Sequence, residues 1–206
     1  DNVFLCLRHD VQPWNDWTLK ITTSSIPNAG RGVFLDGHAA AGRLLCFYSG
    51  ELWRSQDIEE AITAAKNDGE DLDIQYDLDQ LLLGEYTYAR DNGDLLDATP
   101  CERLHDVFRL NPLCVGYCIN HPPKGSLPNL LPLEVPYTFT RDSMKYRPTW
   151  HRKKEVVDPY VTVFLAMRDI TEGEELFFDY DLSEDKDELG KLPPWYHIID
   201  ASAYEP

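Results

Sequence analysis

The sequence predicts a β-rich α+β fold, and two patterns lead to that prediction. Most apolar runs in the 206 residues are short and are bounded by turn residues, which is typical of short strands. One segment, residues 57–66, instead has apolar side chains at helical spacing. Hydrophobic residues make up 43% of the chain, which excludes wholesale disorder. The length fits one domain, or one domain with an inserted piece.

The strand and helix signals are clearest in the first half of the chain. Residues around Ile21 and residues 33–35 are predicted strands separated by a turn that contains Asn28, Gly30 and Gly32. A third strand is predicted over residues 44–48. In the predicted helix 57–66, Asp57 and Glu60 form a capping box and Gly69 provides the stop.

The second half of the chain alternates strand signals with irregular segments. Asn92-Gly93, flanked by residues 86–88 and 95–96, predicts a hairpin. Two further strands are predicted over residues 160–167 and 176–180. The Pro-rich residues 122–136 and the basic residues 141–154 are expected to be irregular loops. The acidic residues 68–79 are expected to be solvated.

Charge restricts the class of partner. The chain has 19 Lys and Arg against 36 Asp and Glu, a net charge of −17. Such a field repels phosphate backbones and anionic membranes and attracts cationic partners. We therefore expect a basic protein or peptide substrate, and neither a nucleic acid nor a membrane as the main partner. The alternative is that the acidity serves solubility alone. The basic stretch at 141–154 is expected to be a solvated loop, and contact with phosphate or with an acidic partner surface is the alternative for it.

The five cysteines are odd in number and scattered, which favours a reducing, intracellular compartment, nuclear or cytoplasmic. Cys101, Cys114, Cys118 and His121 are four soft ligands of the kind that bind zinc, but their spacing fits no Cys-x-x-Cys knuckle. No metal is therefore expected. No apolar run is long enough for a transmembrane helix, and the first residues do not resemble a secretory signal.

Four separated segments carry the functional signal, whereas GxSxG, P-loop, GxGxxG and HExxH motifs are absent. They are residues 28–34 (NAGRGVF), 47–51 (FYSGE), 119–121 (INH) with Pro128-Asn129, and 166–180 (AMRDITEGEELFFDY). In this order they resemble the SET-domain protein lysine methyltransferases over residues 18–183. The NPLxVG run before Asn-His and LAMRDITEGEELF after it are most similar to the SET domain-containing protein 9 subgroup.

The resemblance implies a SET-type β-clip fold: several small twisted sheets, a threaded C-terminal segment and a partly helical insert. It also implies an organisation into a lead-in (residues 1–17), a SET domain (18–183) and a C-terminal segment (184–206). Within the SET domain, a variable insert is expected at about 52–110 and an insertion-like loop at about 130–157. A monomer is expected.

By the same resemblance, the chain is an S-adenosylmethionine-dependent protein-lysine N-methyltransferase that releases S-adenosylhomocysteine, with a histone as one possible substrate. Tyr180 and Tyr48 are the implied catalytic residues. Tyr48 and Trp195 line the lysine channel. The implied cofactor-binding residues are Ala29, Gly30, Arg31, Gly32, Asn120 and His121. The chemistry requires an unprotonated amine, and a free lysine has a pKa near ~10.4, so the site has to remove that proton.

Each of these residues also has a structural interpretation. Tyr180 can be a strand-end tyrosine, Tyr48 and Trp195 can be packing residues, the glycines can belong to turns, and His121 can be a loop histidine. The chain departs from the family where Tyr117-Cys118 replaces the usual Arg-Phe, and where a longer loop follows His121. Two alternative functions therefore stay open. One is a catalytically weak SET-fold module that binds basic protein segments, and the other is an unrelated β-rich binding protein.

Overall fold

The computed structural model describes residues 17–68, 86–99, 112–137, 147–151, 160–182 and 195–204. These residues form nine strands, one α-helix and short 3-10 helices, a β-rich arrangement of small sheets that confirms the predicted fold class. Contacts divide the chain into two compact units. Unit 1 comprises residues 1–46, 118–133 and 163–206, and unit 2 comprises residues 47–117 and 134–162.

Several sequence predictions lie outside the described residues. They concern the lead-in before Trp17, the helix stop at Gly69, most of the acidic run 68–79, and the basic stretch 141–154 except for residues 147–151. Cys101 and much of the predicted insert 52–110 also lie outside them.

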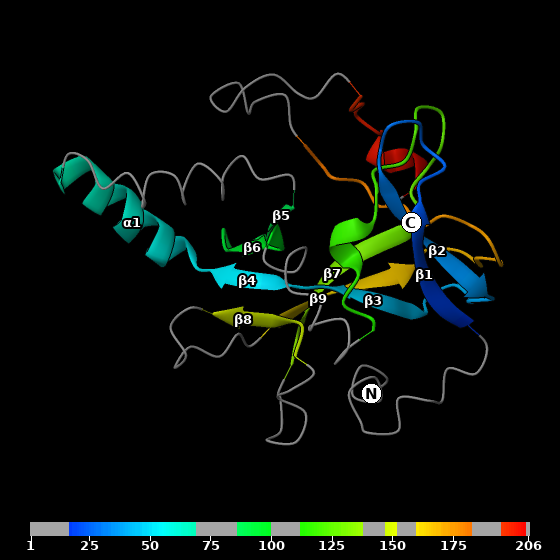
Figure 1. The fold of residues 1–206 in the computed structure, drawn as a ribbon, viewed down its shortest axis with the longest axis horizontal. Helices are drawn as coiled ribbons and strands as arrows, with labels where there is room; N and C mark the ends of the chain where they lie inside the picture. Colours follow the sequence, from blue (N-terminus) through cyan, green and yellow to red (C-terminus); the bar gives the residue numbers. More distant parts are fainter. Residues whose placement is uncertain are drawn as a thin grey trace. The chain divides into compact units, whose positions relative to one another are not determined.

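Unit 1 begins with a hairpin of β1 (Trp17–Thr23) and β2 (Arg31–Gly37), drawn in blue in Figure 1. The strands pair antiparallel, from Trp17↔Gly37 to Thr23↔Arg31. The connecting turn closes by a 2.9 Å hydrogen bond from Ser24 N to Gly30 O, with Gly30 in the left-handed region at φ 74°. The predicted pair of strands and the turn between them are confirmed.

A three-stranded sheet has the order β3-β9-β7. Its members are β3 (Leu44–Tyr48), β9 (Tyr160–Ala166) and β7 (Leu130–Pro136), and unit 1 holds residues 44–46, 163–166 and 130–133 of them. The prediction that 122–136 is irregular throughout is wrong for β7. Pro132 and Pro136 are tolerated because β7 is an edge strand, where a missing N–H costs no ladder hydrogen bond.

The strand predicted over residues 176–180 is also wrong. The structure instead has isolated bridges, Phe34↔Glu175 and Asn120↔Phe177. Leu176 N donates to Val33 O at 2.8 Å, and Phe178 N donates to Asn120 O at 3.2 Å. Because successive residues find partners in different segments, no continuous ladder forms, and the segment joins β2 to the Asn120 region.

Unit 2 contains a four-stranded sheet of order β5-β6-β4-β8. Its strands are β5 (Thr87–Ala89), β6 (Leu95–Asp97), β4 (Gly50–Trp53) and β8 (Thr149–His151). The antiparallel pairing of β5 with β6 confirms the hairpin at Asn92-Gly93. The parallel pair β4–β8 was missed, because each strand is short and β8 falls in the predicted basic loop.

The helix α1 (Ser55–Asp68) begins at Ser55 instead of Asp57, so the predicted capping box is wrong. Ser55 N donates to Asp94 Oδ1 at 3.0 Å, which places a carboxylate of the hairpin at the helix N-terminus, where an anion is favourable. Asp57 instead accepts from the Arg54 guanidinium at 2.9 Å. Among the described residues, no helix is long and apolar enough to cross a membrane.

Candidate functional site

The side chain of Asn120 connects three segments of unit 1 that are far apart in the sequence. Asn120 comes shortly after the 3-10 helix η2 (Gly116–Cys118) in the chain. Its Nδ2 donates to Arg31 O at 2.9 Å, and lies 3.2 Å from both Ser24 Oγ and Glu175 Oε1. An amide nitrogen with two hydrogens shares them among these acceptors. The structure thus brings together the first, third and fourth sequence segments singled out above.

Glu175 is the centre of this arrangement, and its side chain is buried, with 6% of the residue exposed. Its Oε1 accepts from Ser24 Oγ at 2.7 Å, and its Oε2 accepts from Ser25 N at 2.7 Å and Ser25 Oγ at 2.5 Å. A Cβ placed on Gly32 would lie 2.0 Å from Oε1. Glycine at position 32 is therefore required by the close approach of the carboxylate.

The predicted cofactor segment starts at the end of the turn and runs into β2. Ala29, Gly30 and Arg31 are exposed, whereas Gly32 is buried and packs against the Glu175 side chain. A Cβ at Gly30 would meet no heavy atom within 4 Å, so this backbone has open space beside it.

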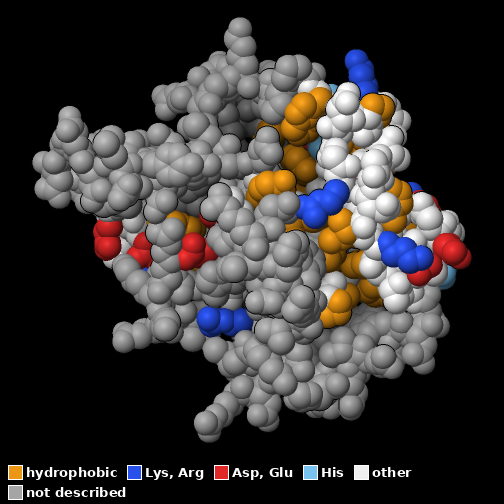
Figure 2. Space-filling model, in the orientation of Figure 1, with side chains coloured by type: hydrophobic (Ala, Val, Ile, Leu, Met, Phe, Trp, Pro, Cys, Tyr) orange, Lys and Arg blue, Asp and Glu red, His pale blue; other side chains and the backbone are white. Residues whose placement is uncertain are grey.

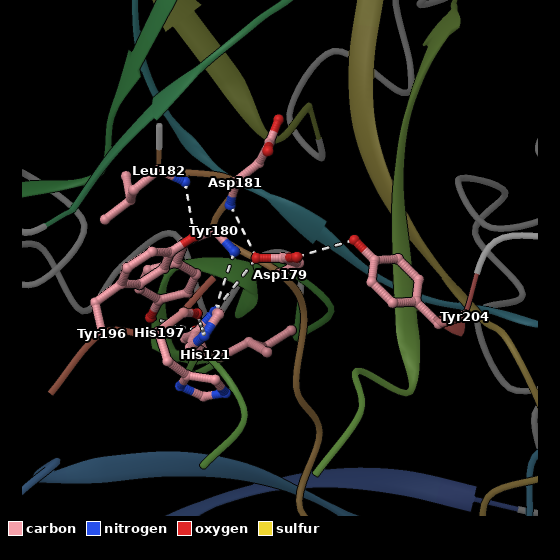
Figure 3. A network of polar contacts seen from close by, with 9 residues as sticks. His121, Asp179, Tyr180, Asp181, Leu182, Tyr196, His197 and Tyr204 are labelled. Carbon is pink, nitrogen blue, oxygen red and sulfur yellow. Dashed lines mark hydrogen bonds and ion pairs between the residues drawn. The ribbon is translucent and has the colours of Figure 1, made fainter. Parts of the chain in front are cut away.

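Both ring nitrogens of His121 are engaged in hydrogen bonds within the chain (Figure 3). Nε2 lies 3.0 Å from the His197 carbonyl oxygen, and the Tyr180 N–H donates to Nδ1 at 3.3 Å. Because a carbonyl only accepts and an amide N–H only donates, Nε2 carries the hydrogen and Nδ1 does not. Burial lowers the pKa of His121 below its ordinary 6.5, while Asp179, 3.5 Å from Nδ1, opposes that shift.

The phenol of Tyr180 is surrounded by rings. Its hydroxyl donates to Ile119 O at 3.0 Å, and its ring centroid lies 4.8 Å from that of Phe178 and 5.5 Å from that of His121. Trp195 contacts it edge-on at 6.1 Å and 89°, with 61% of the tryptophan exposed. The two predicted site residues Tyr180 and Trp195 are therefore neighbours, with the tryptophan on the solvent side.

The segment 195–204 is attached to this cluster at three further points (Figure 3). The Tyr196 ring lies 4.6 Å from His121, and its hydroxyl accepts from Leu182 N at 3.0 Å. Burial raises the pKa of Tyr196. Tyr204 Oη donates to Asp179 Oδ2 at 2.9 Å. These bonds fasten the C-terminal segment over His121.

Tyr48 lies in unit 2, at the end of β3, and is buried. Its hydroxyl donates to Tyr86 O at 2.7 Å, and its ring lies 5.0 Å from that of Tyr88. Tyr86 in turn contacts Tyr117 edge-on at 6.2 Å. Tyr48 thus belongs to an aromatic cluster of unit 2, and its role as a wall of a lysine channel stays a prediction.

Sequence reasoning missed most of the residues that hold the site together. Those without an assigned role are Ser24, Ser25, Asn129, Glu175, Asp179, Tyr196 and His197. Asn129, Glu175 and Asp179 lie inside the quoted motifs, but the run Glu172-Gly173-Glu174-Glu175 does not indicate which of its carboxylates is buried. Glu174 instead forms an ion pair with Arg168, with 2.7 Å between Nη2 and Oε2, and its Oε1 accepts a hydrogen bond from Thr171 N. The Arg168 guanidinium holds the pKa of Glu174 at about 2.

Metal-ligating residues do not cluster in the described part of the chain, where no group of three or more His, Cys, Asp or Glu could hold an ion. Cys46, Cys114 and Cys118 are buried free thiols, and burial raises the pKa of Cys46. On the face seen in Figure 2, described hydrophobic side chains gather from the centre to the right of the view, interspersed with Lys and Arg side chains.

No protein-family model and no curated protein matches this chain. Among solved structures, it is similar to KRYPTONITE in complex with mCHH DNA, an H3(1-15) peptide and SAH, with 18% identity and a TM-score of 0.47 over 82% of this chain. It is also similar to CpSET8 from Cryptosporidium, with 20% identity and a TM-score of 0.46 over 84%. The matched parts are 24% and 61% of those chains, so this chain spans less than two thirds of either protein. Identities and TM-scores at this level describe a remote likeness.

Proposed function

We propose that this chain is an S-adenosylmethionine-dependent protein-lysine N-methyltransferase of the SET-domain kind. The observation that carries the proposal is the hydrogen bonding of Asn120 to Arg31 O and Glu175 Oε1, at 2.9 and 3.2 Å. It joins motif segments that are separated by many residues in the chain, as a composite site requires. The four ordered motifs of the sequence are the second line of support. Membership of the SET domain-containing protein 9 subgroup is part of the proposal.

The residues of the cofactor segment fit the amino-acid end of S-adenosylmethionine. That end carries a carboxylate and an ammonium group, so it needs both donors and acceptors close to an open backbone. The open space beside Gly30 lets a ligand approach the backbone. The exposed guanidinium of Arg31 is a cationic donor that suits the carboxylate of the cofactor. The His121 imidazole fits less well in this structure, because both of its nitrogens are bound within the chain.

When bound, the cofactor supplies an electrophilic methyl group on a sulfonium. The chain itself has to orient a lysine amine in its neutral form. The Tyr180 hydroxyl donates to Ile119 O, so its oxygen keeps lone pairs that can accept an N–H of the amine and fix its direction. The rings of Phe178 and Trp195 offer apolar surface to the lysine methylenes. Transfer of the methyl group would leave the product nitrogen with one proton to lose, and the exposed side of the cluster at Trp195 would give that proton a route to water.

The substrate in this proposal is a basic protein segment, with a histone tail as one candidate. The net charge of −17 favours its approach. Trp195, the exposed aromatic residue beside Tyr180, is the proposed contact for the incoming segment. Tyr48 is proposed as a further channel residue, the chain is proposed to act as a monomer, and its compartment is proposed to be the nucleus or cytoplasm.

Two measurements test the proposal. Thermal unfolding with S-adenosylmethionine should show stabilisation of about 2.7 kcal/mol at 100 times the dissociation constant. Transfer of labelled methyl groups to an array of cellular proteins should then give lysine-specific signals. In Tyr180→Phe we expect a fall in kcat of at least about tenfold with the cofactor affinity retained. Equal incorporation by this variant would remove Tyr180 from the catalytic role.

The alternative is a SET-fold module that binds basic segments with little transfer. The engagement of both His121 nitrogens and the position of Tyr196 against its ring favour this alternative. The two functions separate in one experiment. A binding module retains basic peptides on a column at low salt and incorporates no label, whereas the enzyme incorporates label in proportion to time.

A further inference from the structure

The Glu175 carboxylate accepts hydrogen bonds from one backbone amide and three side chains. Oε1 accepts from Ser24 Oγ and Asn120 Nδ2, and Oε2 accepts from Ser25 N and Ser25 Oγ. These partners are neutral, so the carboxylate is held by directed hydrogen bonds. Such bonds to an ionised acceptor are short and strong, and they impose a definite geometry.

Through these partners Glu175 is connected to both ends of the turn between β1 and β2. Ser24 and Ser25 form its first end, and Ser24 N closes the turn on Gly30 O at 2.9 Å. Asn120, which donates to Glu175, also donates to Arg31 O at the second end. Gly32 packs so closely on Oε1 that no side chain fits between them. A displacement of the carboxylate therefore displaces the whole segment from Ser24 to Gly32.

We infer that Glu175 is a positioning residue for the cofactor segment, setting the place of the backbone of Ala29–Gly32 and of the Asn120 amide. This inference rests on the proposed function, since those residues are the ones assigned to the amino-acid end of S-adenosylmethionine. Glu175 is buried beneath the segment, so it acts through Asn120 and the serines. Its loss should weaken cofactor binding and leave the chemical step of the bound complex nearly unchanged.

Glu175→Gln is the most discriminating change, because it keeps the volume of the side chain and removes one acceptor. The serine hydroxyls can rotate and accept from the new amide, but Ser25 N–H and Asn120 Nδ2 can only donate. They approach different oxygens of the carboxylate. Whichever way the glutamine amide is oriented, its NH₂ group faces one of these two donors, and one end of the segment is released.

Glu174→Gln is the matched control. Glu174 precedes Glu175 and also accepts hydrogen bonds through its carboxylate, but from Arg168 and Thr171, which do not belong to the turn. Ser25→Ala is a milder variant that removes a single hydroxyl donor and keeps the Ser25 amide. It tests the same contact if Glu175→Gln folds poorly.

The experiment combines a cofactor measurement with one that needs no cofactor. In Glu175→Gln, calorimetric titration with S-adenosylmethionine should give a dissociation constant about tenfold higher or more, since hydrogen bonds to a charged group are lost. KM for the cofactor should rise in parallel, while kcat stays within about threefold of wild type. Ser25→Ala should change in the same direction by a smaller factor, and Glu174→Gln should bind as wild type does.

Amide hydrogen exchange provides the second readout. Exchange of residues 24–32 should become faster in Glu175→Gln and stay at the wild-type rate in Glu174→Gln. Unchanged exchange, unchanged affinity, or an equal loss of affinity in Glu174→Gln would overturn the inference. If the wild-type chain binds no S-adenosylmethionine at millimolar concentration, the proposed function fails and the cofactor role of Glu175 fails with it. The exchange rates then still decide whether Glu175 holds the segment.

Discussion

Gly32→Ala should destabilise the chain more than the same change at Gly30, although Gly30 has the more restrictive backbone. The new Cβ would lie 2.0 Å from Glu175 Oε1 and 2.8 Å from its Cδ, whereas real Cβ contacts essentially never fall below 3.0 Å. The carboxylate has to retreat by about 1 Å, the difference between the first and last of these distances. That movement breaks the 2.7 Å bonds from Ser24 Oγ and Ser25 N. Overpacking together with strained hydrogen bonds to a buried charge gives an expected loss of about 2–4 kcal/mol.

The control isolates the steric cause. Gly30 has φ 74° but no heavy atom within 4 Å of a Cβ, so Gly30→Ala carries backbone strain alone, about 1–2 kcal/mol. The free energy of unfolding is measured by guanidinium titration, followed by tryptophan fluorescence and circular dichroism. In a Glu175→Ala background the carboxylate is gone, and Gly32→Ala should then cost less than about 1 kcal/mol. An undiminished cost in that background, or a Gly30→Ala variant that is the less stable of the two, would refute the reasoning.

Two further predictions concern buried polar groups of unit 1. Asn129 donates from Nδ2 to Glu175 O at 2.9 Å and accepts from Phe177 N at 2.8 Å. In Asn129→Asp, a carboxylate oxygen replaces Nδ2 and faces the Glu175 carbonyl oxygen. We therefore expect the free energy of unfolding to fall by about 2 kcal/mol or more. The exposed change Asn28→Asp should alter the free energy of unfolding by less than about 0.5 kcal/mol. Equal losses for the two variants would contradict the role given to the Asn129 hydrogen bonds. His121 has a folded-state pKa below its unfolded value of 6.5, so its contribution to stability is present above that pH and is lost as pH falls through the lowered value. The stability of the wild-type chain should therefore decrease as the pH falls below 6.5, and the decrease should be less steep in His121→Gln. Identical slopes for the two chains would show that another group titrates.

The elements that the sequence predicted correctly are those with local signals. The β1–β2 hairpin, β3, the β5–β6 hairpin and β9 each have apolar runs beside turn residues, and α1 has apolar residues at helical spacing. Turn chemistry and periodicity act over a few residues, so they can be recognised without knowledge of distant partners.

The errors occur where a distant residue decides the local structure. The start of α1 depends on Asp94, which belongs to the hairpin. Residues 176–180 have the composition of a strand, but the N–H groups of residues 176, 177 and 178 donate in turn to Val33 O, the Asn129 side chain and Asn120 O. β8 becomes a strand because β4 offers it an edge. No window of neighbouring residues contains this information.

The candidate site divides in the same way. Motif order in the sequence was enough to select Gly32, Asn120, His121 and Tyr180, because residue type and spacing are properties of the chain itself. Only the tertiary structure decided that Glu175 and not Glu174 is buried beneath the turn, and that the His121 nitrogens bind Tyr180 N and His197 O. A carboxylate or an imidazole has the same identity in water and in a core, and its role depends on which donors the fold brings within hydrogen-bonding distance.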